Sequence, residues 1–255
     1  MPKTIALLTA LLILAPPVTP WTGDDTRVQV LPALPDDVRV LHFDPRGRGR
    51  LVAALGDPLH AKHIAVVVPG SDVDVPRFGA VLAMARAVHQ EAGRPDDLAV
   101  VAWLGYDTPE GVGVDAATGR LARAGAEALT AFVRDLPPTA LVHLLCHSYG
   151  SVVCALAAHD LDVADIVFTG SPGVRAGSVA ELGTGARVWA ARAGRDWTRW
   201  VPKVRLGDLG HGTDPTGAGF GARVFDAGDG KHDEYYRAGG DSLRTIARIV
   251  VGDAR

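Results

Sequence analysis

The sequence predicts an α/β fold in which helices cover both faces of a mostly parallel sheet. Continuous aliphatic runs, typical of strands buried on both faces, alternate with helical patterns along most of the chain. Several of these runs end in glycine, proline or serine, at the strand ends where such folds bind ligands. One run ends in "LLCHSYGSVV" (144–153), where a histidine and two serines separate two apolar stretches. This stretch is the first candidate for a functional site.

The length and charge of the chain are those of a soluble globular protein. Its 255 residues are enough for one large α/β domain or two small ones, and folds of this class often use one. A composition of 47% hydrophobic and 22% charged residues excludes a disordered or fibrous chain. The formal net charge of −3 offers no basic surface to a polyanion, so we expect no nucleic-acid partner.

The first 25 residues form a separate segment. One lysine precedes an apolar run at 5–15, which is followed by a proline-rich break. This pattern predicts a signal peptide or an N-terminal hydrophobic anchor, and the run is short for a membrane span. We expect an exported protein, secreted or associated with the cell envelope. No A-x-A cleavage site follows, so a retained anchor and a cytoplasmic protein stay as alternatives.

The remaining elements are predicted in chain order within one domain, residues 36–255. Apolar alternation on either side of the turn "DPRGRGR" predicts an antiparallel pair of strands, and the later strands and helices alternate. The predicted strands are 38–43, 51–55, a run within 63–72, 97–107, 140–146, 163–169, 187–193 and 223–225. The predicted helices are 77–91, 118–136, 148–159 and 241–251, and the glycine-rich stretch 194–225 is a loop or small cap.

Ser148 is the predicted nucleophile. It follows a buried strand and opens a helix, in a variant of the G-x-S-x-G turn that has Cys146 in place of the first glycine and keeps Gly150. A serine hydroxyl becomes nucleophilic only when a base removes its proton. The alternative is a serine that merely caps a helix.

The acid and the base should follow the serine in the chain. Asp196 comes just after a predicted strand, and His232 lies between the last short strand and the final helix, so we expect these two to complete a triad. The competing bases are His211 and His147. The competing acids are Asp208, Asp214 and Asp165, the last of which precedes its strand and so falls at the wrong end of the sheet.

The developing negative charge on a substrate oxygen needs hydrogen-bond donors already in place. The backbone amide after the nucleophile, that of Tyr149, is one expected donor, and the amide of Ser71, in the loop after Pro69 and Gly70, is the other. A plain strand-ending turn is the alternative for this loop.

The cysteines and histidines predict neither a disulfide nor a metal site. Cys146 and Cys154, eight residues apart, would lie at a strand end and in the second turn of the following helix. We expect this geometry to hold their Cα atoms too far apart for a disulfide, which leaves two free thiols. No Cys or His pair has the spacing of metal ligands, so no metal is expected.

Seven segments together resemble a known family. They are "FDPRGRGRLVAALGD", "HIAVVVPGSD", "AWLGYDTPEG", "CHSYGS", "FTGSPGV", "HGTDPTGAGFGARVF" and "KHDEYY", in this order over roughly residues 38–252. They are similar to the actinobacterial α/β-hydrolases that form a family of unknown function. The resemblance implies the α/β-hydrolase fold, the nucleophile at Ser148, the acid at Asp196 and the histidine at His232, and it assigns no substrate.

The predicted function is therefore a serine hydrolase, a carboxylic-ester hydrolase that forms an acyl-enzyme from a small-molecule ester and needs no cofactor. An acyltransferase with the same triad and a catalytically silent binding protein remain as alternatives. Tyr106 and Asp107 are expected either at the site entrance or in a packed turn. Trp189, Trp197 and Trp200 form either an apolar acyl pocket or part of the core.

Overall fold

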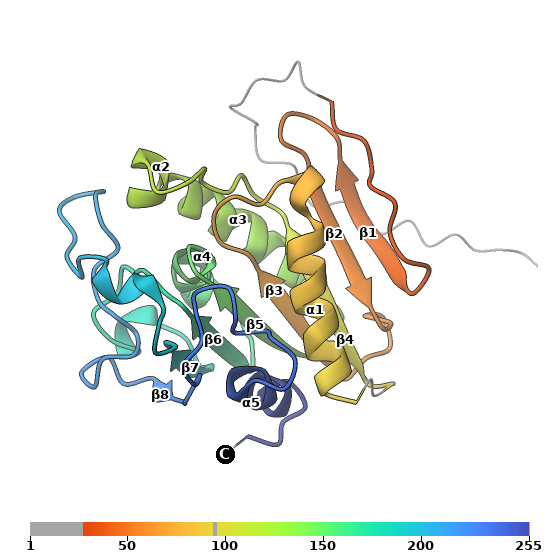
Figure 1. Cartoon of the computed structure of the whole chain (residues 1–255). Helices are drawn as coiled ribbons and strands as arrows, with labels where there is room; N and C mark the ends of the chain where they lie inside the picture. Colours follow the sequence, from red (N-terminus) through yellow and green to blue (C-terminus); the bar gives the residue numbers. More distant parts are fainter. Residues whose placement is uncertain (1–27, 94–95, 255) are drawn as a thin grey trace, which may run out of the picture.

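The computed structural model describes residues 28–93 and 96–254. Its centre is a mixed sheet with strand order β1-β2-β4-β3-β5-β6-β7-β8 (Figure 1). The strands are β1 Val38–Asp44, β2 Arg50–Leu55, β3 His63–Val68, β4 Leu98–Leu104, β5 Leu141–His147, β6 Asp165–Thr169, β7 Arg187–Ala191 and β8 Arg223–Val224. The predicted signal or anchor segment, 1–25, lies outside the described residues.

The sheet is parallel except at one edge. β1 pairs with β2 as the sequence predicts, and β2 also pairs antiparallel with β4. The pairs from β4 through β3, β5, β6 and β7 to β8 are all parallel. The carboxyl ends of these six consecutive parallel strands therefore meet along one edge of the sheet, which is where the candidate site lies.

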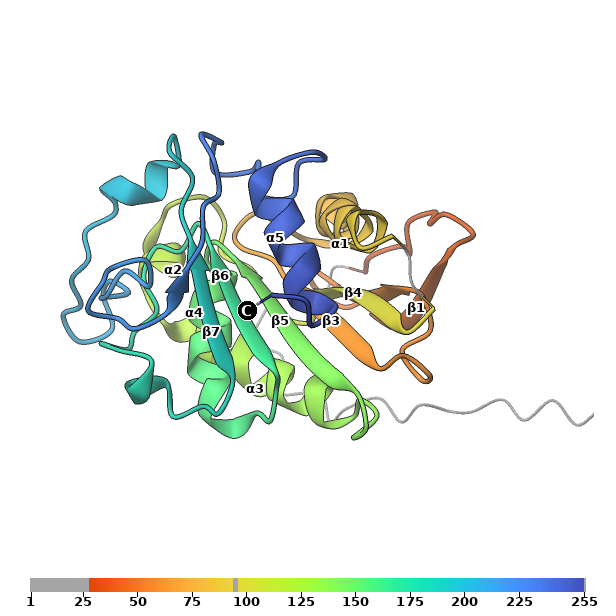
Figure 2. The same ribbon diagram turned by 90° about the horizontal axis from the view of Figure 1, so that it is seen from below.

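Helices cover both faces of the sheet (Figure 2). α3 packs beside α4 on one face, and α1 packs beside α5 on the other. Successive residues of β3 alternate between the two cores, with Val66 in one and Val67 in the other, as the pleat of a strand requires. The α-helices are α1 Gly79–Glu91, α2 Val114–Ala117, α3 Arg120–Arg134, α4 Gly150–Ala157 and α5 Asp241–Val250.

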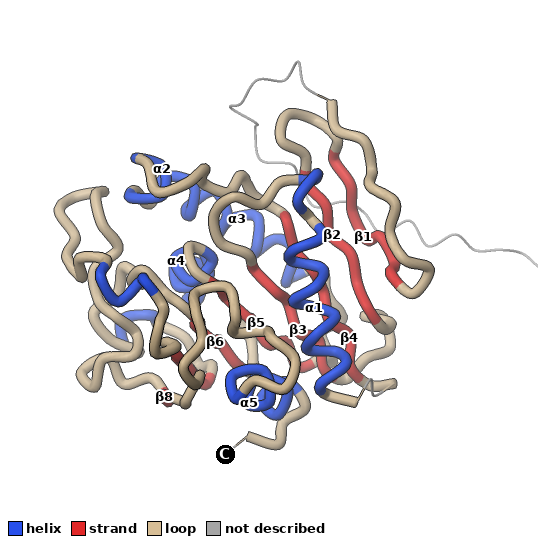
Figure 3. The backbone as a smooth tube through the Cα atoms, in the orientation of Figure 1, coloured by secondary structure: helices blue, strands red, loops and turns tan. Residues whose placement is uncertain are grey.

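Long loops lie over the carboxyl edge of the sheet (Figure 3). The connection from β7 to β8 contains a short 3₁₀ helix, η4 Trp197–Trp200, and is otherwise irregular, as predicted for 194–225. Further 3₁₀ turns are η1 Val75–Arg77, η2 Ala158–Asp160 and η3 Ala180–Leu182. Among the described residues, no helix combines the length and the apolar character needed to cross a membrane.

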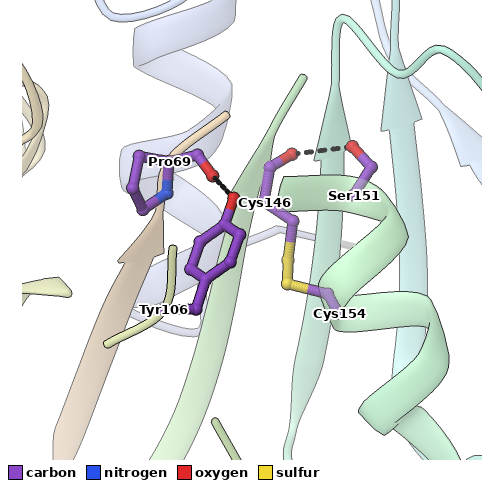
Figure 4. Close-up of a disulfide and its surroundings, with 5 residues drawn as sticks. All are labelled: Pro69, Tyr106, Cys146, Ser151 and Cys154. Carbon is purple, nitrogen blue, oxygen red and sulfur yellow. Dashed lines mark hydrogen bonds between the residues drawn. A yellow bond between two sulfur atoms is a disulfide. The ribbon is translucent and has the colours of Figure 1, made fainter. Parts of the chain in front are cut away.

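The two cysteines form a disulfide, so the prediction of free thiols is wrong (Figure 4). Cys146 near the end of β5 and Cys154 in the second turn of α4 have Cα atoms 6.4 Å apart, within the usual range for a disulfide. The prediction did not account for how sharply the chain turns between the two cysteines. Ser148 adopts a left-handed conformation with φ of 54°, and α4 packs back against β5. The bridge therefore links the strand that precedes Ser148 to the helix that follows it.

Removing the disulfide is expected to loosen this turn. The Cys146→Ala/Cys154→Ala variant should lose about 2.5 kcal/mol of unfolding free energy, since the bridge no longer restricts the unfolded chain. Urea denaturation with and without reductant measures the effect: reductant should destabilise the wild type and leave the variant unchanged. Equal stability of the variant and the wild type without reductant would show that the bridge contributes nothing.

Candidate active site

Ser148 stands on a sharp turn between β5 and α4. Its left-handed φ of 54° is uncommon for a residue with a side chain, and its amide donates a 2.9 Å hydrogen bond to the carbonyl of Thr169 at the end of β6. A Cβ on Gly150 would lie 2.4 Å from the carbonyl oxygen of Val68, so only glycine fits this position. The turn leaves the Ser148 side chain half-buried at the carboxyl edge of the sheet.

Three predicted residues from distant parts of the chain lie in one hydrogen-bonded line. The Oγ of Ser148 is 2.9 Å from Nε2 of His232. The Nδ1 of His232 is 2.9 Å from Oδ1 and 3.1 Å from Oδ2 of Asp196. This is the geometry in which a histidine can take a proton from a serine while a carboxylate fixes its tautomer.

Asp196 is fully buried and surrounded by donors. Its Oδ1 accepts hydrogen bonds of 2.8 Å from both the amide and the hydroxyl of Thr198, and its Oδ2 accepts one of 2.6 Å from the hydroxyl of Tyr235. Burial by itself raises the pKa of Asp196, but the hydrogen bonds from His232, Tyr235 and Thr198 outweigh it and hold the pKa well below its usual value. The carboxylate is therefore charged at neutral pH.

His232 lies between two aromatic rings. The ring centroids of His147 and Trp197 are 4.8 Å and 4.9 Å from that of His232. Burial and the neighbouring His232 lower the pKa of His147 to about 3, so this ring packs as a neutral group. Gly170, after β6, leaves the necessary space, because a Cβ there would lie 2.8 Å from Oδ2 of Asp196.

The two expected oxyanion donors flank the serine. The Tyr149 side chain is buried, and its hydroxyl donates to the Thr118 carbonyl at 2.7 Å, so the side chain is engaged in the interior. A Cβ on Gly70 would lie 2.6 Å from the Cβ of Ser148, so the loop that carries Ser71 closely approaches the serine. Within the described residues, neither the Tyr149 nor the Ser71 amide hydrogen-bonds to another protein group.

The competing acids and base lie elsewhere. His211 is buried with Nε2 2.7 Å from the carbonyl oxygen of Ala116. Asp208 and Asp214 form ion pairs with arginines. Asp165 begins β6 at the amino edge, where it accepts hydrogen bonds from buried side chains. None of the four contacts Ser148.

The expected pocket residues divide between core and surface. Tyr106 is buried, and its hydroxyl donates a 2.7 Å hydrogen bond to the carbonyl of Pro69, so it packs a turn rather than lining an entrance (Figure 4). Trp189 is also buried and donates to Asp165 at 2.7 Å, far from the serine. Trp197, beside His232, is the tryptophan that reaches the site.

Sequence reasoning missed the residues that hold the acid. The spacing of Asp196 and Thr198 is that of an aspartate capping its own turn, and this pattern could have indicated Thr198. Tyr235 is brought to Asp196 by a turn of the chain after His232 that no local pattern specifies.

One group of side chains could offer ligands to a metal ion. The ligand atoms of His147, His232 and Asp233 lie within 4.8 Å of one another. Both ring nitrogens of His232 already lie within hydrogen-bond distance of Ser148 and Asp196. A metal ion bound by His232 would therefore compete with these hydrogen bonds.

Comparison with known proteins identifies the family of the chain. A family model described as alpha/beta hydrolase matches residues 44–206, which include the serine turn and the acid. The chain belongs to this family. The chain is 35% identical over 274 aligned residues to an uncharacterized protein of Mycobacterium tuberculosis (strain ATCC 25618 / H37Rv), an alignment that covers 90% of this chain and 42% of that protein. The chain thus spans less than half the length of this relative.

Two further comparisons concern a second relative and the fold. An uncharacterized protein of Mycobacterium bovis is 34% identical over 158 residues, covering 55% of this chain and 58% of its own. The chain also superposes on an a/b serine hydrolase without lid from Xanthomonas campestris, with a TM-score of 0.53 and 20% identity over 87% of this chain and 96% of that one. At that identity the match shows the shared fold.

Proposed function

We propose that this hydrolase cleaves carboxylic esters by way of an acyl-enzyme. The observation that carries the proposal is the line of hydrogen bonds from Ser148 through His232 to the buried, charged Asp196. Ser148 is also held in a strained, left-handed turn, as expected for a side chain that must stand clear of its neighbours.

Each residue has a definite step in this mechanism. The Oγ of Ser148 attacks the ester carbonyl carbon while Nε2 of His232 takes the hydroxyl proton. The imidazolium then gives that proton to the leaving alcohol oxygen as the C–O bond breaks. A water molecule, deprotonated by His232, attacks the acyl-enzyme and releases the acid. Asp196 stabilises the imidazolium throughout and does not itself take the proton.

The oxyanion of each tetrahedral intermediate would bind the backbone amides of Tyr149 and Ser71. Their freedom from internal hydrogen bonds within the described residues and the close approach of Gly70 to Ser148 support this role. Such donors stabilise the transition state because they are already oriented when the charge develops.

The test is turnover of p-nitrophenyl esters of increasing acyl length. An ester hydrolase should release nitrophenol in a burst followed by a slower steady rate whenever deacylation limits turnover. Adding a polyol acceptor separates the acyltransferase alternative, which would give a new ester instead of the free acid. Absence of turnover with every ester would favour a silent binding protein.

Replacing Tyr235 with phenylalanine tests the support of the acid. Loss of a hydrogen bond to a buried charged group should lower kcat about tenfold and leave KM nearly unchanged, since the tyrosine does not face the substrate. The control is Thr198→Ser, which keeps both donors to Asp196 and should retain activity. The measurement is kcat and KM of both variants by steady-state kinetics. Full activity in Tyr235→Phe would contradict a role of Tyr235 in supporting Asp196.

We also propose that the hydrolase acts outside the cytoplasm. Structural disulfides persist mainly in oxidising compartments, so the bridge between Cys146 and Cys154 supports export, as does the apolar run at 5–15. Fractionating cells that produce the full chain, with thiols alkylated at lysis, tests it: an oxidised protein outside the cytoplasm is expected, and a reduced cytoplasmic protein would contradict it.

A further inference from the structure

The loops beside the candidate site expose several large apolar side chains. Trp200 is 82% exposed and Leu206 77% exposed, in a segment of the β7–β8 connection that begins with Trp197. This segment lies against the α2 region, since Gly210 donates to the carbonyl of Ala117. We call this surface the apolar rim. It consists of Val112, Val114, Trp197, Trp200, Val204, Leu206 and Leu209.

One end of the apolar rim, Trp197, contacts the catalytic His232. The ring of Trp197 is 4.9 Å from that of His232, and the rest of the segment extends from there to the left of Figure 1. Exposed apolar surface of this size usually marks an interaction site, because contact between apolar side chains and water is unfavourable in free energy. The rim therefore brings whatever covers it close to the catalytic base at Trp197.

The charges of the rim favour an anionic partner. Arg199 and Arg205 are exposed and, among the described residues, donate only to backbone carbonyls. The acidic side chains that adjoin rim residues in the sequence are paired with arginines, whereas the exposed Asp233, next to His232, forms no ion pair within the described residues. These pairs are Asp208 with Arg123 and Arg175, Asp115 with Arg120, and Glu110 with Arg48.

We propose that the apolar rim docks on the surface of an anionic lipid layer, and that the substrates are esters drawn from that layer. Tryptophan beside exposed arginine suits the boundary between headgroups and acyl chains, where the ring inserts and the cation binds phosphate. The substrate class rests on the proposed function, whereas docking itself does not. Docking would place the Ser148 hydroxyl at the lipid surface.

Flotation of the full chain with vesicles tests the docking. The wild type should bind phosphatidylglycerol vesicles at least about tenfold better than phosphatidylcholine vesicles. The Trp200→Ser/Leu206→Ser variant should bind phosphatidylglycerol about tenfold less tightly, because two inserted side chains are lost. The Arg199→Gln/Arg205→Gln variant should lose the preference for the anionic lipid.

Two controls keep the outcomes distinct. Leu59→Ser/Leu141→Ser removes exposed leucines from the opposite, amino edge of the sheet and should bind vesicles like the wild type. Ser148→Ala should also bind normally, so failed docking and failed catalysis are separate results.

Two outcomes would overturn the proposal. One is unchanged vesicle binding in the rim variants, which would assign any binding to the apolar run at 5–15. The other is a dimer that only the rim variants abolish, measured by size-exclusion chromatography, together with no vesicle binding. That result would show that the rim binds a second copy of the chain instead of a lipid surface.

Discussion

Ser148→Ala is expected to lower ester hydrolysis by about 10⁶-fold, the largest effect of any single change in this protein. Among residues 28–93 and 96–254, only the hydroxyl of Ser148 lies at the turn after β5 and within hydrogen-bond distance, 2.9 Å, of Nε2 of His232. Without it, the base has no proton to take and no acyl-enzyme forms. Any residual rate would come from the oxyanion donors and from substrate binding.

A matched control for this variant is Ser151→Ala. Ser151 lies three residues further along, is buried, and its hydroxyl donates to the carbonyl of Cys146 at 3.2 Å rather than to His232 (Figure 4). It should keep activity within a few-fold of the wild type. The two variants are compared by their initial rates with a p-nitrophenyl ester, measured on folded protein. Comparable losses in the two variants would indicate a packing defect instead of a lost nucleophile.

Asp165→Ala is expected to have the largest effect on stability, a loss of about 3–5 kcal/mol of unfolding free energy. Asp165 is fully buried at the amino edge of the sheet. Its carboxylate accepts hydrogen bonds of 2.8 Å from Arg187 and His143 and 2.7 Å from the indole of Trp189. Removing the carboxylate leaves these donors without their acceptor inside the protein, which is why the loss is large.

The effect of Asp165 should depend on pH. Burial raises the pKa of Asp165, but the hydrogen bonds from His143, Arg187 and Trp189 outweigh it and lower the pKa overall. Because the pKa of Asp165 is lower in the folded state than in the unfolded state, its carboxylate stabilises the fold. The stabilisation is full at pH values above the unfolded-state pKa of about 3.9, and it is lost as the pH falls through the folded-state pKa. The gap between wild type and Asp165→Ala should therefore be full at pH 7 and shrink below about pH 4.

Urea denaturation across this pH range measures the gap. Asp162→Ala, which removes an exposed acid three residues earlier, should change stability by less than about 0.5 kcal/mol. Because Asp165 is remote from Ser148, the folded Asp165→Ala protein should keep its kcat. A stability gap that stays constant down to pH 3 would contradict an ionised, hydrogen-bonded carboxylate.

The sequence predicts the elements of this fold well because its local signals are strong. The run at 63–68 is aliphatic after its first residue, as a strand buried on both faces must be, and Pro137 and Pro138 mark a limit beyond which α3 cannot continue. The helix predicted from Ser148 instead begins at Gly150, because Ser148 takes the left-handed conformation. The pairing of β2 with β4 is not predictable locally, since it joins segments separated by β3 and α1.

The candidate site is predictable only in part for the same reason. The order of Ser148, Asp196 and His232 along the chain follows from the α/β arrangement, because each residue comes after a strand whose carboxyl end lies at the same edge. The disulfide and the contact of Tyr235 with Asp196 depend instead on how turns bring side chains together. Cys146 shows this best: its side chain points to α4 and bonds there, so the turn accepts it in place of glycine.

The central claim, that Ser148 is the nucleophile, is tested most directly by covalent labelling. Protein treated with a fluorophosphonate probe is digested, and the modified residue is located by tandem mass spectrometry. The account predicts one label on Ser148 in the peptide that contains "CHSYGS", no label in Ser148→Ala and much slower labelling in His232→Ala. A label on another serine, or labelling of Ser148→Ala at the wild-type rate, would contradict it.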